Sequence, residues 1–325
     1  MKRVSILVPE EAVLASIDDP RMMFAGVNEF LESEGKPAMF DIQLVGLSKE
    51  VHLHKGLFTV HSSALIHEVE KTDLIFVPAL SGDLEKALEK NRPFLAWIIA
   101  QYEAGAEVAS LCIGTFLLAS TGLLDGKECS THWRYAQEFR KMFPNVTLVD
   151  DRIITEDQGL YTSGGANSYW NLLLYLVEKF TSREMAILAS KVYALEIERT
   201  SQSPFIMFNG QKEHEDEDVR KAQEFIEKNV TERISVEGLA TMYAIGRRSF
   251  EKRFKKATNN TPVEYIQRVK IEAAKRHLET SRKNVNEVMY DVGYSDTKAF
   301  RTIFKRITGL SPIEYRNKYN KKIMV

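Results

Sequence analysis

The pattern of hydrophobic and polar positions divides the chain of 325 residues into two regions of different character. In the first region, short apolar runs of the length of a buried strand alternate with longer segments whose apolar residues recur every three or four positions. This alternation predicts a mostly parallel β-sheet with helices on both faces. The runs lie at residues 4–8, 40–46, 74–77 and 108–111, a helical segment at 94–103, a later hairpin at 148–154 and 160–162, and a helix opened by Gly164 and Gly165 at about 167–180.

The second region contains one pattern twice, at a shift of 50 positions. In each copy an apolar stripe predicts a short helix, a tight turn follows, and a second helix places two phenylalanines on one face because they are four positions apart. Ser235 is expected to cap the first helix of the first copy, whose second helix is predicted over 247–257. Ser295 is expected to cap the second helix of the second copy, which is predicted to start at Asp296. The matching residues are Phe250 with Phe300, Phe254 with Phe304, Lys255 with Lys305, Thr258 with Thr308, Pro262 with Pro312, Glu264 with Glu314 and Tyr265 with Tyr315.

Each copy therefore has the organisation of a helix-turn-helix, in which the second helix can enter the major groove of double-stranded DNA. If the phenylalanines are buried, basic and hydroxyl side chains of the second helices point outward. Such side chains suit guanine edges and phosphates. One such helix alone would more often be a solvated basic surface, but two in register indicate a DNA-binding domain. The candidate DNA-binding residues are Arg247, Arg248, Ser249, Lys252, Thr297, Lys298, Arg301, Thr302 and Lys305.

Several short motifs are spread over this region. They are Leu239-Ala240, Arg247-Arg248-Ser249-Phe250, Phe254-Lys255-Lys256, residues 268–274 with Leu278, Val292-Gly293-Tyr294-Ser295-Asp296, Phe300, Phe304-Lys305 and residues 309–316. On these motifs, residues 219–319 resemble the DNA-binding domain of the AraC/XylS family of bacterial transcription regulators. The resemblance implies an all-α domain of two helix-turn-helix units, joined by a long helix at about 262–279. Asn260 and Thr261 stand where the first unit of that family often has a glycine-containing turn.

Charge divides the chain in the same way. Residues 219–325 contain 24 Lys and Arg against 12 Asp and Glu, whereas residues 1–218 contain 20 against 33. A basic module joined to an acidic one is typical of a nucleic-acid binder with a second, non-binding domain. Turn-forming and acidic residues between the two predict a linker over 201–218, which leaves domains at 1–200 and 219–325.

Other classes of protein fit the composition poorly. Two cysteines do not form a disulfide framework, and no apolar run reaches the roughly 18 residues of a membrane span. The amino-terminal residues lead directly into a strand-like run rather than the apolar core of a signal peptide. We therefore expect a cytoplasmic protein without a membrane partner.

The first region holds one chemically suggestive site. A strand that ends at Cys112 is followed at once by a helical pattern from Thr115, which is the strand–turn–helix context of a nucleophile elbow with cysteine in place of serine. The start of a helix is expected to lower the pKa of the thiol, and His132 lies twenty positions later as a candidate base. The simpler interpretation is a buried structural cysteine beside a histidine that contacts a ligand.

Three segments extend this pattern: residues 111–119 with 122–126, Thr131-His132-Trp133, and residues 161–165. On them, the first region resembles the class I glutamine amidotransferase-like (ThiJ/PfpI) superfamily, in the form that is fused to AraC-type regulators. The resemblance implies a flavodoxin-like α/β domain in which Cys112 matches the elbow cysteine and His132 matches the histidine. Active members place an acid against this cysteine after the first strand, but residues 12–14 are apolar here. Nor is there a carboxy-terminal His-x-Glu pair.

Because an activated nucleophile needs its base and orienting group together, this domain is expected to sense a small molecule rather than to catalyse. The candidate effector pocket contains Cys112, Ile113, His132, Gly164 and Gly165, and neither a metal nor a cofactor is expected. The predicted function is a sequence-specific transcription regulator that binds double-stranded DNA, responds to a small-molecule effector and forms a homodimer. The alternatives are a DNA-tethered cysteine hydrolase or amidotransferase-like enzyme, and a thiol redox sensor that acts through Cys112.

Overall fold

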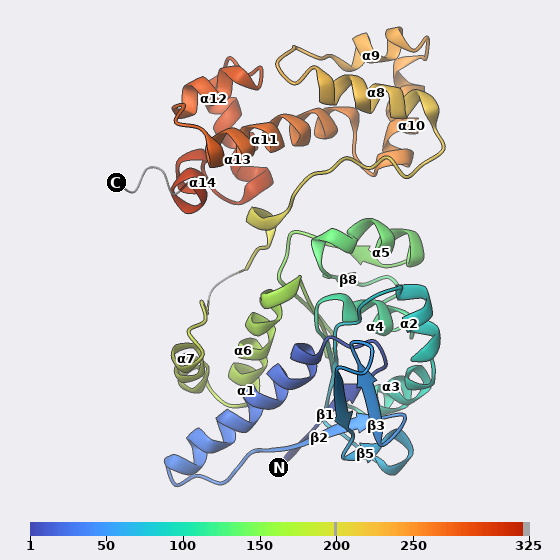
Figure 1. Ribbon diagram of the computed structural model, residues 1–325, viewed down its shortest axis with the longest axis vertical. Coiled ribbons are helices and arrows are strands. Elements are labelled where there is room, and N and C mark those ends of the chain that lie inside the picture. The colour runs from blue at the N-terminus through green and yellow to red at the C-terminus, as the bar shows by residue number, and fades with distance from the viewer. Residues whose placement is uncertain (198–199, 321–325) are drawn as a thin grey trace. The chain divides into compact units, whose positions relative to one another are not determined.

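The computed structural model describes residues 1–197 and 200–320 of the chain. They fall into two units, Met1–Gln202 and Ser203–Val325, which run from blue to yellow-green and from yellow to red in Figure 1.

A seven-stranded sheet with the strand order β10-β11-β7-β6-β1-β2-β5 forms the centre of the first unit. Every neighbouring pair is parallel except the β10–β11 hairpin. In β1 the residues from Val4 to Val8 are all buried, as expected for a strand that is covered on both faces. The strands of this sheet are β1 (Lys2–Val8), β2 (Phe40–Gly46), β5 (Ala64–Leu65), β6 (Leu74–Val77), β7 (Glu107–Ser110), β10 (Ile154–Asp157) and β11 (Leu160–Ser163).

Helices cover both faces of this sheet, as Figure 1 shows. On one side lie α1 (Leu14–Ser33), α6 (Tyr169–Phe180) and α7 (Arg183–Val192), and on the other lie α2 (Leu84–Lys90), α3 (Pro93–Glu103) and α4 (Thr115–Ala119). The expected flavodoxin-like architecture is thus confirmed. The remaining elements of the unit are the hairpin of β3 (Glu50–Leu53) and β4 (Phe58–His61), the parallel pair β8 (Glu128–Cys129) and β9 (Thr147–Leu148), and α5 (Ala136–Met142).

Three expected boundaries in the first unit were wrong. The strand before the elbow ends at Ser110 rather than at Cys112, because the chain turns into a short 3₁₀ segment. Leu148 pairs with β8 instead of joining the later hairpin. Helix α6 begins at Tyr169, after a 3₁₀ turn at Ala166–Ser168 that the glycine pair introduces.

In the described residues of the second unit all regular elements are helices, and they are arranged along one long helix, α11 (Pro262–Thr280). Figure 1 shows the α8–α10 group at one end of α11 and the α12–α14 group at the other. The other helices are α8 (Glu217–Lys228), α9 (Val236–Met242), α10 (Arg247–Thr258), α12 (Val285–Asp291), α13 (Thr297–Thr308) and α14 (Pro312–Tyr319).

The helices begin where side chains can satisfy the free backbone amides. Ser235 caps α9 as expected, but Asp296 rather than Ser295 caps α13, which therefore begins at Thr297. Thr261 and Ser311 each form a capping box with a glutamate three residues later, followed by proline at the first helical position. In both copies of the repeat, the helix that follows the second helix of the helix-turn-helix therefore begins with the same kind of capping sequence.

The described helices include none long and apolar enough to cross a membrane.

Candidate functional site

The recognition helices of the two helix-turn-helix units are α10 and α13. Two fully buried phenylalanines hold each helix in place: Phe250 and Phe254 in α10, and Phe300 and Phe304 in α13. The opposite face of each helix is therefore turned to solvent. The predicted DNA-binding residues Arg247, Arg248, Ser249, Lys252, Lys298, Arg301, Thr302 and Lys305 are all exposed, and Thr297 is half-buried.

One arginine of α10 has a structural rather than a surface role. The guanidinium of Arg253 donates to Asp216 at 2.6 and 2.9 Å and to Asp218 at 2.9 Å. Asp216 is also the cap of α8, and hydrogen bonds from Arg253 hold the pKa of this carboxyl below its ordinary value. Arg253 therefore ties α10 to α8, which explains why it does not belong to the exposed basic face.

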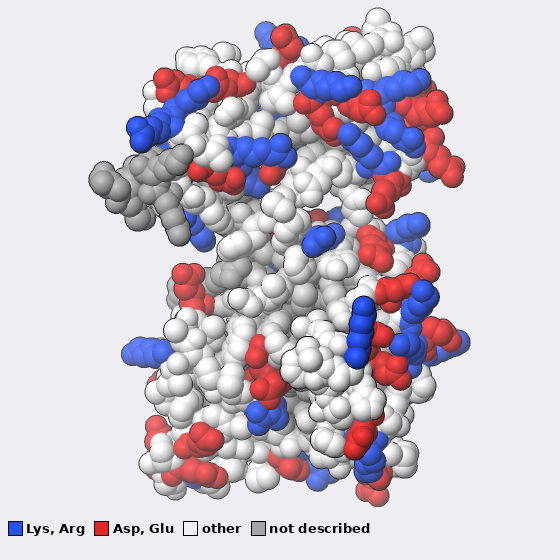
Figure 2. Space-filling view, viewed as in Figure 1, with Lys and Arg blue, Asp and Glu red and all other residues white. Residues whose placement is uncertain are grey.

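One cation of α10, Arg247, is less free than the other predicted DNA-binding cations of the two recognition helices. Arg247 already forms ion pairs with Glu251 at 3.1 Å and Glu237 at 3.8 Å. Among the described residues, Lys298 and Arg301 of α13 have no ion pair within 4.0 Å. Figure 2 likewise shows Lys and Arg side chains interspersed with Asp and Glu on the visible face of the second unit.

Lys270, in the middle of α11, was missed as a functional residue because a lysine in a helical pattern usually points to solvent. Here it is buried, and its Nζ atom donates to the carbonyls of Val230 at 2.6 Å, Glu232 at 3.0 Å and Val292 at 2.9 Å. Burial lowers the pKa of this amine. Val230 and Glu232 precede the first helix-turn-helix, and Val292 lies in the turn of the second. Lys270 therefore fixes the two helix-turn-helix units to each other.

In the first unit, the backbone around Cys112 has the geometry of a nucleophile elbow. Cys112 adopts a φ of +56°, a conformation that is strained for any residue with a side chain, and its amide donates to Ser163 Oγ at 3.0 Å. A Cβ atom on Gly114 would lie 2.4 Å from the carbonyl oxygen of Val77, so only glycine fits where the chain turns back under β6. Since β7 and β11 are parallel neighbours, Cys112 and the Gly164–Gly165 pair come to the same edge of the sheet.

The expected lowering of the Cys112 pKa was wrong. Burial raises the pKa of the thiol to about 11, although the backbone amides of Ala166 and Ile113 donate to the sulfur and oppose this shift. The Ala166 amide lies 3.4 Å from Sγ. Helix α4 has five residues, so its dipole is small against the loss of hydration. The thiol is therefore protonated at neutral pH.

His132 is close to the same turn but is not oriented as a base for the thiol. In the described residues, the hydrogen bond of its ring joins Nδ1 to the Arg134 amide at 3.1 Å. A Cβ atom on Gly165 would lie 2.5 Å from the imidazole, which therefore packs directly on the Gly165 backbone. Burial lowers the pKa of His132, so the ring is neutral at pH 7. The predicted pocket residues Cys112, Ile113, His132, Gly164 and Gly165 thus meet around one turn.

An acid does approach this cluster, from an element that the sequence did not indicate. Asp19 of α1 accepts a hydrogen bond from the Tyr169 hydroxyl at 2.5 Å, and burial raises the pKa of this carboxyl. A negative charge on Cys112 would raise the pKa of Tyr169 further, because the two groups are close together. The carboxylate is therefore separated from the thiol by a tyrosine instead of bonding to it.

Gln202 was also missed, since it lies some forty residues beyond the glycine pair with no motif around it. It is buried, its Oε1 atom accepts from the Gly165 amide at 3.0 Å, and its Nε2 atom donates to the Thr131 carbonyl at 3.0 Å. The cluster therefore consists of thiol, imidazole, amide and backbone groups. Within the described part of the chain, no group of three or more His, Cys, Asp or Glu side chains could hold a metal ion.

Comparison with known proteins finds a similarity for each unit. The profile of a helix-turn-helix domain matches residues 239–318, and that of the DJ-1/PfpI family matches residues 22–179. The HTH-type transcriptional regulator GbdR of Pseudomonas aeruginosa is 26% identical over 233 residues, which are 70% of this chain and 62% of that protein. The regulator ArgR of the same species is 26% identical over 215 residues, 66% of this chain and 65% of that protein. The chain thus spans less than two thirds of the length of these relatives.

Among solved structures, a putative transcriptional regulator from Vibrio parahaemolyticus superimposes with a TM-score of 0.53 at 22% identity. The match covers 59% of this chain and 98% of that one, and it supports the fold alone.

Proposed function

We propose that this chain, which joins a DJ-1/PfpI domain to an AraC-type helix-turn-helix domain, is a sequence-specific transcription regulator that binds double-stranded DNA. The observation that carries the proposal is the pair of recognition helices with exposed basic faces on one long helix. The names of GbdR and ArgR, both HTH-type transcriptional regulators, support it. No transmembrane helix is found in the described residues, and we place the regulator in the cytoplasm, where it can reach DNA.

In this proposal the DNA-binding residues are those on the outward faces of α10 and α13. The arginines and lysines donate to guanine edges and phosphates, and the hydroxyls of Ser249, Thr297 and Thr302 to bases or phosphates. Because Lys270 holds the two helix-turn-helix units in one arrangement, less conformational entropy is lost when both recognition helices bind DNA at once. This supports simultaneous binding of the two helices.

The first unit, in the same proposal, binds a small polar effector at the turn formed by Cys112, His132 and the glycine pair, without catalysis. Three properties support a binding rather than a catalytic role. The thiol is protonated at neutral pH, the imidazole bonds to the Arg134 amide, and Asp19 bonds to Tyr169. A nucleophilic thiolate needs a base within hydrogen-bond reach and a lowered pKa.

The strained backbone at Cys112 nevertheless favours two other functions that would use this cysteine. One is a DNA-tethered cysteine enzyme, and the other is a redox sensor that acts through the thiol. Both need a thiolate near neutral pH, whereas burial raises the Cys112 pKa to about 11. We expect iodoacetamide to alkylate Cys112 slowly at pH 7 and the rate to rise until about pH 11, measured by mass spectrometry of the peptide that contains Cys112. A rate that is already constant between pH 6 and pH 8 would show a thiolate and would restore both alternatives.

We further propose a homodimer, since two linked DNA-binding modules bind paired half-sites far more tightly than one. Sedimentation of the full chain at micromolar concentration should give twice the monomer mass of 37.1 kDa. A monomer at that concentration would contradict the dimer and leave the DNA-binding proposal intact.

The experiment that tests the proposed function is to incubate the protein with fragmented DNA from its own genome and to sequence the retained fragments. A regulator should retain a small set of fragments that share one sequence motif. The matched control is an Arg301→Ala variant, whose fold should be unchanged because Arg301 is exposed. Retention without any shared motif, or equal retention by the variant, would contradict sequence-specific binding.

A further inference from the structure

Gln202 is a buried polar residue at which the first unit ends. Besides its bonds to the Gly165 amide and the Thr131 carbonyl, Gln202 donates from Nε2 to the Arg152 carbonyl at 3.3 Å. Its backbone N–H donates to the Asp151 carbonyl at 2.8 Å. The side chain of Gln202 is therefore fully hydrogen-bonded to backbone groups of the first unit.

Two of these partners belong to the candidate effector site. The Thr131 hydroxyl donates to the Cys112 carbonyl at 3.0 Å, and the Gly165 backbone lies against the His132 ring. A ligand that bonds to the Gly165 amide or the Thr131 carbonyl would compete directly with Gln202.

The residues after Gln202, 203–212, form a strap along the second unit. The strap begins on the second helix-turn-helix: the Pro204 carbonyl accepts from the Tyr319 hydroxyl at 3.4 Å, and the Lys318 ammonium lies 5.1 Å from the centroid of the Phe205 ring. A first anchor thus follows the buried Gln202 within three residues of chain.

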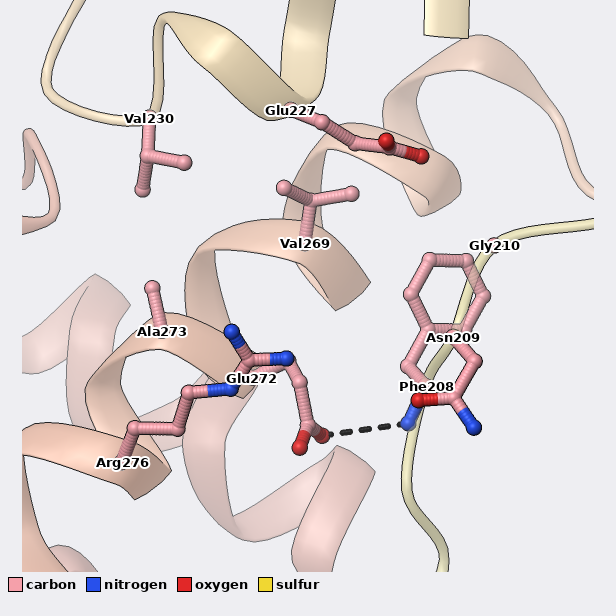
Figure 3. Close-up of a pocket in the computed structure, with 9 residues that line it drawn as sticks. All are labelled: Phe208, Asn209, Gly210, Glu227, Val230, Val269, Glu272, Ala273 and Arg276. Carbon is pink, nitrogen blue, oxygen red and sulfur yellow. Dashed lines mark hydrogen bonds between the residues drawn. The ribbon is translucent and has the colours of Figure 1, made fainter. Parts of the chain in front are cut away.

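The middle of the strap is attached to α11. The Ile206 carbonyl accepts from the buried Lys275 at 2.6 Å. The Phe208 amide donates to Glu272 at 3.2 Å, as the dashed line in Figure 3 shows, and its ring meets the edge of Tyr265 at 5.1 Å between centroids.

The end of the strap is attached to the first helix-turn-helix. Gln211 accepts from Gln223 of α8 at 2.9 Å through its carbonyl, and from Asn260 at 2.6 Å through its side chain. Lys212 forms an ion pair with Glu227 of α8 at 2.6 Å. The strap therefore touches both helix-turn-helix units and the helix between them.

The strap is held at separate points rather than by continuous packing. A pocket of about 250 Å³ opens between Phe208 to Gly210 of the strap and the side chains of Val230, Val269 and Ala273 (Figure 3). A segment that covers a pocket loses few contacts when it lifts, so a modest loss of anchoring at one end can release it.

We propose that Gln202 couples the Cys112–His132 site to the DNA-binding unit through this strap. The inference rests on the proposed function and adds its route of regulation. A ligand that takes over the Gly165 amide or the Thr131 carbonyl releases Gln202 and loosens the strap, and with it the support that the strap gives to both helix-turn-helix units. Such a coupling is reciprocal, so that loosening the strap also loosens the site.

Hydrogen–deuterium exchange of the full chain, without DNA or ligand, tests the coupling. In Gln202→Leu we expect the amides of the strap, which lie in the other unit, to exchange about fivefold faster or more, the effect of losing one to two hydrogen bonds. Gln101→Leu is the matched control. Gln101 is also buried in the first unit, accepts from one amide and donates to two carbonyls, but has no link to the strap. It should leave exchange in the strap unchanged.

A second variant tests the coupling from the other end and guards against misfolding of the first. Phe208→Ala removes the ring that anchors the strap to α11, and it should accelerate exchange of the Gly165 amide in the first unit. Strap exchange within twofold of wild type in Gln202→Leu, or an effect of Phe208→Ala confined to the second unit, would overturn the coupling. Neither result depends on DNA, whereas failure to retain any DNA would overturn the proposed function alone.

Discussion

The two helix-turn-helix units of this protein have separate cores that are packed in the same way, but they differ at the start of their recognition helices. The ring centroids of Phe250 and Phe254 are 5.6 Å apart, and those of Phe300 and Phe304 are 5.8 Å apart. A tyrosine meets the second ring edge-on in both units, at 5.3 and 5.5 Å. Even the threonine that closes each helix repeats, since Thr258 and Thr308 both donate to the preceding phenylalanine carbonyl at 2.8 Å.

The starts of the recognition helices, which face the solvent, are not alike. Helix α10 begins after Gly246, which has no side chain to cap it, and its first arginine is paired with two glutamates. Helix α13 begins after Asp296, whose carboxylate accepts from the Ala299 amide at 2.9 Å. Duplication has therefore preserved the residues that build the unit while those that would meet DNA diverged, and we infer that the two units read different base sequences.

Lys270 joins the two helix-turn-helix units, so its replacement should have the largest effect on the stability of the second unit. Lys270→Met leaves the carbonyls of Val230, Glu232 and Val292 without their donor, and because the bond to Val292 is buried this should destabilise the second unit by about 3 kcal/mol. Because each helix-turn-helix has its own apolar cluster, the unfolding of the second unit in urea should also separate into two transitions. Lys256→Met, at an exposed position of α10, should change stability by less than about 0.5 kcal/mol. A variant that unfolds in one step at the wild-type midpoint would show that the units do not depend on Lys270.

The unequal pairing of the cations predicts unequal contributions to DNA binding. Arg301→Ala should weaken binding to a retained DNA fragment by about 2 kcal/mol, within the range expected for an arginine that contacts a base. Arg247→Ala should cost less, because Arg247 must first give up surface ion pairs worth about 0.2–1 kcal/mol. Titration by fluorescence anisotropy at one fixed salt concentration measures both, with Arg92→Ala in the first unit as the control for charge. An Arg247→Ala variant that binds more weakly than Arg301→Ala would reverse the comparison.

The caps of the two recognition helices should give the smallest difference. Asp296→Ala removes a capping side chain and should destabilise the protein by about 1 kcal/mol. Gly246→Asp supplies the missing cap and should stabilise it by a few tenths of a kcal/mol, since a Cβ atom at Gly246 meets no other atom within 4 Å. Urea denaturation followed by circular dichroism resolves the sign of each change. If Gly246→Asp does not stabilise the protein, the start of α10 is already capped in another way.

Much of this architecture could be predicted from the sequence because it depends on periodicity. The repeat located α10 and α13 through residues such as Phe254 and Phe304, whose spacing requires one buried face. The apolar residues located β2 and β6 to the residue, and β6 is a continuously hydrophobic, fully buried strand, whereas β2 also contains Asp41 and Gln43. Turn chemistry was harder, since Ser295 and Asp296 are both good caps and only the folded backbone decides between them.

The features that depend on long-range contacts could not be predicted. Burial, which no local pattern reports, reversed the expected pKa shift of Cys112. Lys270 and Gln202 are polar residues whose partners lie at least 22 and 37 positions away along the chain. Asp19 reaches Tyr169 across 150 positions. Each of these side chains acquires its role from elements that meet only in the folded protein.

The most direct test of the account is a hydroxyl-radical footprint of the full chain on a retained DNA fragment. Two recognition helices fixed on one body should protect two segments on the same face of the DNA, with centres about 34 Å or one helical turn apart. Arg301→Ala should weaken protection of one segment more than the other. A single short protected segment that Arg301→Ala leaves unchanged would contradict the claim that both units read DNA together.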